Sequence, residues 1–135
     1  MTSIGDGAFQ LCYSLTNASL SNNLTSISAS MFSNCSNLKN ISIPSSVTSI
    51  GNYAFRNCYS LVNITLPNGL TSINTNTFEN CTSLTSITIP DSVTSISGSA
   101  FSGCTALTSI IVNKPEGSIT GAPWGATNAT VQWTG

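Results

Sequence analysis

Five cysteines recur at one fixed spacing, and they are the side chains in this sequence best suited to metal or redox chemistry. They are Cys12, Cys35, Cys58, Cys81 and Cys104, with a constant step of 23 in the numbering. Zinc sites usually draw on close pairs such as Cys-x-x-Cys, which this spacing does not provide. Stacked copies would bring neighbouring thiols within ~5 Å, but parallel side chains resist disulfide formation. We therefore predict free, buried cysteines that pack as small apolar side chains, and no metal site.

The other ionisable side chains are too few for acid–base catalysis. The sequence has no His, and its charged residues are four Asp or Glu and three Lys or Arg. The carboxylates stand in different parts of the chain, and no Ser has a His partner. We predict that the protein is not an enzyme and uses no cofactor. We also expect the charges to fall out of register and to be individually solvated, at Asp6, Lys39, Arg56, Glu79, Asp91, Lys114 and Glu116.

The low charge restricts the class of partner as well. Three cations cannot neutralise a phosphate backbone, which excludes electrostatic binding of nucleic acid. There is no polybasic stretch for an anionic membrane surface, and the apolar runs are too short for membrane insertion. Most polar residues of the sequence are uncharged, because 57 of the 135 residues are Ser, Thr or Asn.

Seven Asn-x-Ser/Thr triplets are a second kind of candidate site. Their asparagines are Asn17, Asn23, Asn34, Asn40, Asn63, Asn80 and Asn128. In a secreted eukaryotic protein these residues would be glycan acceptors. A sequence so rich in Asn, Ser and Thr also produces such triplets by composition alone. We favour composition, and the source organism would decide between the two.

The cysteine spacing belongs to a 23-residue repeat that runs through five copies without an insertion. A Phe precedes each Cys by three positions, and a Leu follows each Cys by three. Four further apolar columns keep the same period: Ala18, Ile41, Ile64, Ile87, Ile110; Leu20, Ile43, Leu66, Ile89, Val112; Met1, Leu24, Val47, Leu70, Val93; and Ile4, Ile27, Ile50, Ile73, Ile96. A repeat of this length takes precedence over secondary structure inferred from short segments alone, because each unit must pack against its neighbours.

The spacings within one unit predict how the chain runs. Residues 87–89 alternate apolar and polar, as in a half-buried strand that Pro90 then ends. Residues 93–96 form a short extended arm with two outward hydroxyls. The spacing of three from Phe101 to Cys104 and to Leu107 fits a helical or 3₁₀ turn. Coils of this kind stack at about 4.8 Å, so we predict a repeat solenoid of about five coils, roughly 24 Å long.

The pattern fades after residue 112. Residues 113–135 place Trp124 in the Phe column, and residues 131–133 read as a closing strand. Because solenoids need capping elements, we divide the chain into a repeat array over 1–112 and a C-terminal cap over 113–135. Met1 occupies a core column in the middle of a unit, so we expect a piece of a longer array. Its uncapped first coil predicts end-to-end self-association.

The unit L-x-x-I-x-I-P-x-x-V-T-S-I-x-x-x-A-F-x-x-C resembles the 23-residue leucine-rich repeat of BspA-like surface proteins. The match covers residues 1–112, and the segment from Gly121 to Val131 is similar to sequences that follow such arrays. The resemblance implies a leucine-rich-repeat fold in the form of a right-handed horseshoe or arc. It further implies an extracellular, cell-surface location and a role in adhesion or host-protein binding.

The candidate binding surface is the concave face formed by the outward side chains of the main strands. We select two adjacent columns of uncharged residues: Asn17, Ser19, Asn40, Ser42, Asn63, Thr65, Ser86 and Thr88. They could contact a host protein or glycan through many weak hydrogen bonds. The alternative is a structural role, because stacked Asn or Thr can hydrogen-bond along a ladder.

The predicted function is a non-enzymatic extracellular binding module. One alternative is a structural stalk or spacer within a longer surface protein. A remote third is ice binding by a regular threonine column, Thr2, Thr25, Thr48, Thr71 and Thr94. Polar cover on a β-like surface, where Thr has good propensity, explains that column equally well.

Overall fold

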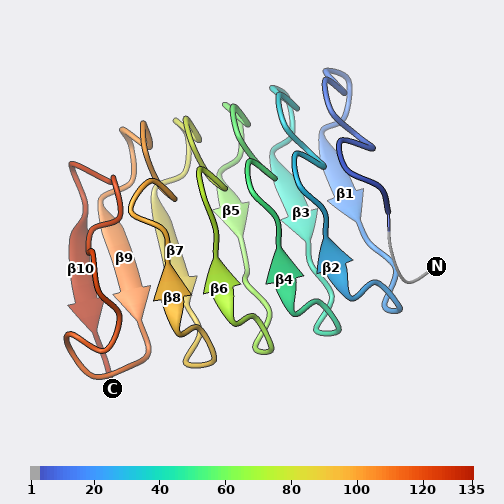
Figure 1. Ribbon diagram of the computed structural model, residues 1–135. Helices are drawn as coiled ribbons and strands as arrows, with labels where there is room; N and C mark the ends of the chain where they lie inside the picture. Colours follow the sequence, from blue (N-terminus) through green and yellow to red (C-terminus); the bar gives the residue numbers. More distant parts are fainter. Residues whose placement is uncertain (1–3) are drawn as a thin grey trace.

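The computed structural model describes residues 4–135 and shows a parallel β-solenoid of about five turns, which confirms the predicted fold class (Figure 1). We number the coils 1 to 5 by their 23-residue units, which begin at residues 1, 24, 47, 70 and 93. The predictions that fall on Met1, Thr2 and Ser3 lie outside the described residues. Residues 4–135 contain no helix, and so none that could span a membrane.

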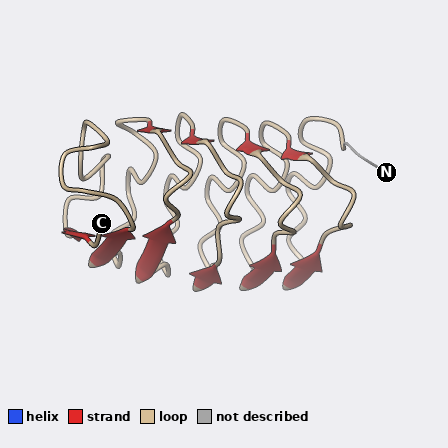
Figure 2. Ribbon diagram, turned by 90° about the horizontal axis from the view of Figure 1, so that it is seen from below, coloured by secondary structure: helices blue, strands red, loops and turns tan. Residues whose placement is uncertain are grey.

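Coils 2 to 5 each contribute one strand to each of two rows. The long row contains β1 (Asn17–Ser19), β3 (Asn40–Ser42), β5 (Asn63–Ile64), β7 (Ser86–Ile89), β9 (Ser109–Val112) and β10 (Thr130–Trp133). The short row contains β2 (Ser26–Ile27), β4 (Ser49–Ile50), β6 (Ser72–Ile73) and β8 (Ser95–Ile96). Figure 2 shows the two rows on opposite sides of the coils. Burial alternates along the long strands, as in β7, where Ile87 and Ile89 are buried and Ser86 and Thr88 are exposed.

All strand pairs are parallel, and from coil to coil they keep the 23-residue register. Asn17 pairs with Asn40, and Asn40 pairs with Asn63. The closing strand predicted at residues 131–133 is present as β10. Its register differs, because Thr130 pairs with Ser109, 21 positions earlier. The last turn is therefore two residues shorter than the others.

The third side of each coil, the turn side, consists of tight turns where helical or 3₁₀ turns were expected. The Cys35 amide donates to the Phe32 carbonyl (3.2 Å), and the Leu38 amide donates to the Cys35 carbonyl (3.1 Å). These bonds span three residues, as in a 3₁₀ turn, but they do not continue into a helix. A second set joins successive coils, as when the Phe32 amide donates to the Ala54 carbonyl at 2.8 Å.

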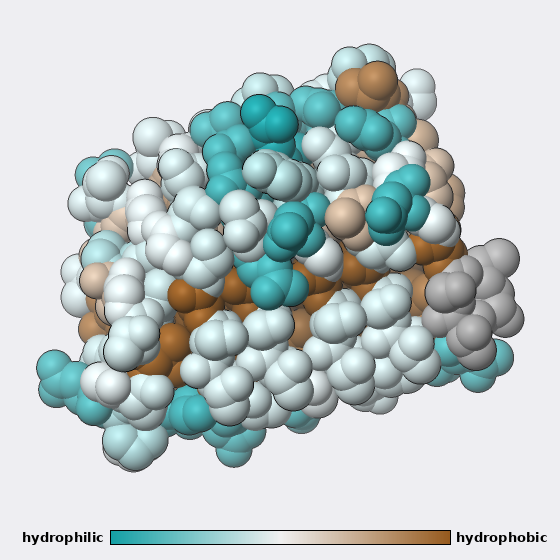
Figure 3. All heavy atoms as spheres, in the orientation of Figure 1, coloured by the Kyte–Doolittle hydropathy of each residue, from teal (hydrophilic) through white to brown (hydrophobic). Residues whose placement is uncertain are grey.

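A column of phenylalanine rings forms the centre of the core. The ring centroids from Phe9 to Phe101 lie 5.4 to 5.5 Å apart, and neighbouring planes differ by only 3 to 9°. Phe55 is fully buried, whereas Phe9 in the first coil is 36% exposed. The Leu, Ile and Val columns surround the rings. Seen from one side, the apolar atoms form a band along the molecule between polar side chains (Figure 3).

Trp124 occupies the next position of the phenylalanine column and is fully buried. Its carbonyl accepts from the Phe101 amide (3.0 Å), and its indole Nε1 donates to the Thr120 carbonyl (2.7 Å). The Trp133 ring meets it edge-on at 6.2 Å. These contacts place two large rings over the end of the fifth coil, and they support the capping role that we propose for residues 113–135.

The cysteines are free thiols, as predicted, and four of the five are buried. Their side chains also have a bonding role that the sequence did not indicate. The Cys58 thiol donates to the Phe32 carbonyl of the preceding coil (3.2 Å), and Cys35, Cys81 and Cys104 make the equivalent bond. Each buried thiol thus links the phenylalanine backbone of one coil to the next.

We expect replacement of a central ring to cost more than replacement of the first one. Phe55→Ala removes a side chain packed between Phe32 and Phe78, and should lower the free energy of unfolding by about 3–5 kcal/mol. Phe9→Ala is the matched control and should cost clearly less, because that ring is partly exposed. Urea denaturation measures both. Equal losses would contradict a core centred on the ring stack.

The buried thiols should resist modification in the folded protein. Burial raises the pKa of Cys58 to about 12 and also raises the pKa values of Cys35 and Cys81. The hydrogen bond with Cys81 lowers the pKa of Cys104, whose protection rests on its burial alone. At neutral pH we expect a disulfide reagent to label Cys12, which is only partly buried, and to label the other four cysteines only after unfolding. Rapid labelling of two or more thiols in the native protein would contradict this.

The same shifts predict lower stability in alkali. A thiol whose pKa is raised by folding ionises first in the unfolded chain, so the stability is complete below about pH 9 and falls as the pH rises toward 12. The Tm should therefore fall between about pH 9 and pH 12. Cys58→Ser should make the fall smaller, and an unchanged pH dependence in this variant would count against the assignment.

Candidate functional site

The eight predicted residues all lie on one surface, the long-strand face, which we define as the outward side of β1, β3, β5, β7 and β9. All eight side chains are exposed. Asn17 and Asn40 are in register, and the Asn40 side-chain amide donates to the Asn17 oxygen (3.2 Å). Asn17, Ser19, Asn40 and Ser42 thus form a continuous polar patch over coils 1 and 2.

The other four predicted residues, Asn63, Thr65, Ser86 and Thr88, line a groove of about 280 Å³ at β5 and β7. The groove is also lined by Asn68 and Asn113, which were not selected from the sequence. Buried Ile64, Leu66, Ile87 and Pro90 complete the lining. No charged residue lines the groove. The structure therefore divides the eight predicted residues into a patch and a groove.

The groove coincides with an interruption of the hydrogen-bond ladder between coils 3 and 4. β5 ends one three-stranded sheet and β7 begins the next. At the strand entrance, the Val62 amide donates to the Lys39 carbonyl (3.2 Å), and the Thr108 amide donates to the Thr85 carbonyl (3.1 Å). Within residues 4–135, the equivalent bond from Thr85 to Val62 is missing.

The short row is interrupted at the same junction, because β4 ends one pair and β6 begins the next. The Thr71 amide lies 3.3 Å from the Thr48 carbonyl, whereas the corresponding bonds at the neighbouring junctions measure 2.9 Å. One carbonyl also changes its donor. Ile50 accepts from the side-chain amide of Asn74 (2.7 Å) in place of a backbone amide. Both rows of strands thus loosen between coils 3 and 4.

Gly69 removes one side-chain hydrogen bond beside the loosened short row. In two other coils a serine at the same repeat position donates to a carbonyl 22 residues earlier, one turn back along the solenoid: Ser46 to Leu24 (2.6 Å) and Ser92 to Leu70 (2.6 Å). Gly69 has no side chain with which to bond the Val47 carbonyl. A Cβ added at Gly69 would lie 3.8 Å from that oxygen, with no steric conflict.

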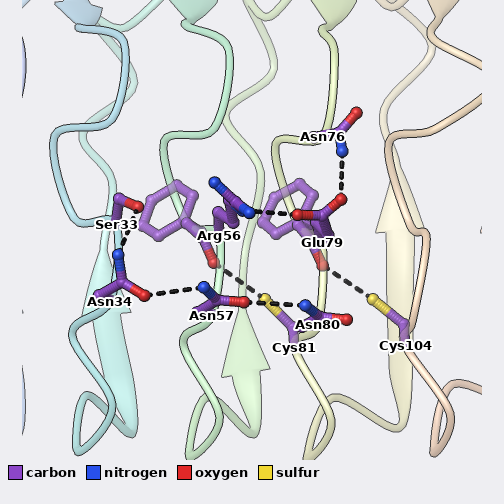
Figure 4. Close-up of polar contacts among 11 residues, drawn as sticks. Ser33, Asn34, Arg56, Asn57, Asn76, Glu79, Asn80, Cys81 and Cys104 are labelled. Atoms are coloured by element: carbon purple, nitrogen blue, oxygen red, sulfur yellow. Dashed lines mark hydrogen bonds and ion pairs between the residues drawn. The ribbon is translucent and has the colours of Figure 1, made fainter.

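The turn side holds the same junction closed (Figure 4). The Phe55 amide donates to the Thr77 carbonyl and the Asn57 amide to the Glu79 carbonyl, both at 2.8 Å. Arg56 Nε forms an ion pair with Glu79 at 2.6 Å. The expectation that charges fall out of register is therefore wrong for this pair. Arg56 and Glu79 occupy the same repeat position in neighbouring coils, and the spacing of 23 contained that signal.

An asparagine column on the turn side was also missed. The Asn57 side-chain amide donates to the Asn34 oxygen (2.7 Å), and that of Asn80 donates to the Asn57 oxygen (2.9 Å) (Figure 4). All three residues have positive φ, in the left-handed region that Asn tolerates better than most residues. Two of these side chains belong to Asn-x-Ser/Thr triplets, and here they have a structural role.

The threonine column is bonded within the protein. The hydroxyls of Thr48, Thr71 and Thr94 donate to the threonine carbonyl of the preceding coil at 3.2 to 3.5 Å. These weak bonds orient the hydroxyl donors toward the backbone and away from an external ligand. Within residues 4–135, no three His, Cys, Asp or Glu side chains come together as a possible metal site.

Comparison with known proteins places the repeat in a family. The family model for the BspA type leucine rich repeat region matches residues 2–122 in six copies. A T. pallidum leucine rich repeat protein superimposes with a TM-score of 0.81 at 29% identity over 97% of this chain. A leucine rich cell surface protein from Faecalibacterium prausnitzii A2-165 superimposes with a TM-score of 0.77 at 31% identity over 88%.

A leucine-rich repeat protein from Bacteroides ovatus is a third similar structure, with a TM-score of 0.63 at 32% identity over 84% of this chain. The chain spans 62% of the T. pallidum structure, 32% of the F. prausnitzii structure and 37% of the B. ovatus structure. No curated protein matches the chain.

We expect Gly69→Ser to stabilise the protein by supplying the donor that this junction lacks. The hydroxyl can reach the Val47 carbonyl. One such bond contributes about 1 kcal/mol to the free energy of unfolding. Gly69→Ala is the control for the lower backbone entropy of the unfolded chain, and Ser92→Ala should show the opposite change. Urea denaturation of all three variants measures the effect. No gain of Gly69→Ser over Gly69→Ala would contradict the role assigned to Gly69.

Proposed function

The chain belongs to the BspA type leucine rich repeat family, and from this premise we propose that it is an extracellular binding module that uses its long-strand face. The partner class is a host extracellular protein or glycan. A cell-surface location is consistent with the description of the F. prausnitzii structure as a cell surface protein. The proposal includes no catalytic step.

The observation that carries the proposal is the regular exposure of uncharged polar side chains on that face. Asn and Ser or Thr project at every second strand position and recur from coil to coil. Each hydrogen bond with a partner is weak, so affinity depends on several contacts made at once and on further copies in a longer array. A rigid solenoid favours binding through several simultaneous contacts, because its side chains are already ordered before binding.

A structural spacer is the second candidate, and a specific observation favours it. Many polar side chains bond one turn back along the solenoid, as Ser46 and Thr94 do, and thus stiffen the stack. In that role residues 1–135 themselves would bind nothing. We propose one further contact in either case, end-to-end self-association through the first coil, where Phe9 and Leu11 are exposed.

Combined replacement of Asn40, Ser42, Asn63 and Thr65 by Ala should abolish binding and leave the fold intact, because all four side chains are exposed. Surface plasmon resonance over extracellular-matrix proteins and glycans measures binding, and circular dichroism checks the fold. Thr48→Ala with Thr71→Ala on the opposite face is the control and should bind normally. Binding that survives the fourfold change would disprove the use of the long-strand face. If the unchanged protein binds none of these partners, the result favours the spacer.

A further inference from the structure

Asn63 in the groove between β5 and β7 differs from Asn17 and Asn40 of the same column, because its side chain makes no hydrogen bond within the described residues. On coils 1 and 2, the amides of Asn17 and Asn40 bond to each other. In the groove, five of the six polar lining side chains make no hydrogen bond within the described residues. These five are Asn63, Thr65, Asn68, Ser86 and Thr88. The sixth, Asn113, accepts from the Thr134 hydroxyl (2.8 Å).

The backbone adds further unpaired groups at the same place. Because the ladder is interrupted, the edges of β5 and β7 face each other across coils 3 and 4 without the usual bonds. Backbone amides and carbonyls are strong hydrogen-bonding groups, so a ligand that both donates and accepts gains more here than at a paired strand. Asn side chains offer both functions as well, and hydroxyls can do either.

We propose that this groove binds a neutral saccharide unit, an assignment that rests on the proposed function and specifies the ligand of that surface. Sugar hydroxyls both donate and accept, which matches the mixed lining. The absence of a charged lining residue leaves an anionic or cationic ligand without a counter-charge. The volume of about 280 Å³ lies just below the usual range for small-molecule sites and suits a single sugar ring.

An extended peptide fits the junction less well. A strand inserted between β5 and β7 needs two inter-strand spacings, each of about 4.8 Å. The turn side prevents such separation, because the Phe55 and Phe78 rings lie 5.5 Å apart and Arg56 bonds to Glu79 across the same junction. The ligand must therefore lie over the two edges and contact them from the solvent side, as a compact polyhydroxylated ring can.

The test is an NMR titration of the full chain with uncharged sugars: methyl mannoside, methyl galactoside and N-acetylglucosamine. We expect at least one of them to shift the amide signals of Ile64 and Ile87 with saturation. Asn63→Ala combined with Ser86→Ala should weaken this binding by about tenfold or more, because two hydrogen bonds are lost. Asn17→Ala combined with Asn40→Ala is the matched control on coils 1 and 2, and it should leave the binding unchanged.

Three results would overturn the assignment: no shift at Ile64 and Ile87 with any of these sugars, a shift that survives the groove substitutions, or an equal loss in the control variant. A short uncharged peptide that shifts these signals when the sugars do not would replace the saccharide with a peptide ligand. Failure here differs from failure of the proposed function. Binding to a matrix protein, abolished by the fourfold change on the long-strand face, would leave that function in place.

Discussion

The structure depends on one constraint: each residue must lie beside its own copy in the next coil. The 23-residue unit meets this constraint, and identical side chains stack as a result. Phe55 packs on Phe78, Asn80 bonds to Asn57, and the Cys81 thiol reaches the Phe55 carbonyl. Since each coil contacts only its neighbours, stability is close to a sum of such repeated contacts. An inserted residue would shift every column beyond it.

Departures from the repeat show which contacts can be lost without losing the register. Both rows of strands loosen between coils 3 and 4, where Gly69 lacks the side chain that bonds one turn back elsewhere in the solenoid. The turn side keeps its backbone bonds and adds the Arg56–Glu79 ion pair. The coils therefore stay stacked while one polar groove opens on the long-strand face. Variation at a few positions creates a local site on an otherwise uniform scaffold.

The repeat consensus was enough to predict what every copy shares. The strand columns, the buried free cysteines and the closing strand at Val131 follow from spacing and apolar pattern. The consensus could not predict contacts that depend on which residues are neighbours. Arg56 and Glu79 look unrelated until their positions are compared across coils. The interruption at β5 could not be foreseen, because it reflects the geometry of two particular copies.

Amide hydrogen exchange tests the central claim most directly, that coils 3 and 4 are joined on the turn side and open at both rows of strands. The account predicts fast exchange at Thr85 and Asn74, whose backbone amides lack the inter-coil bond that Thr108 and Ser97 make. It predicts slow exchange at Phe55 and Asn57 on the turn side of the same junction. Equal protection of Thr85 and Thr108 would contradict the account, because the junction would then be as closed as the others.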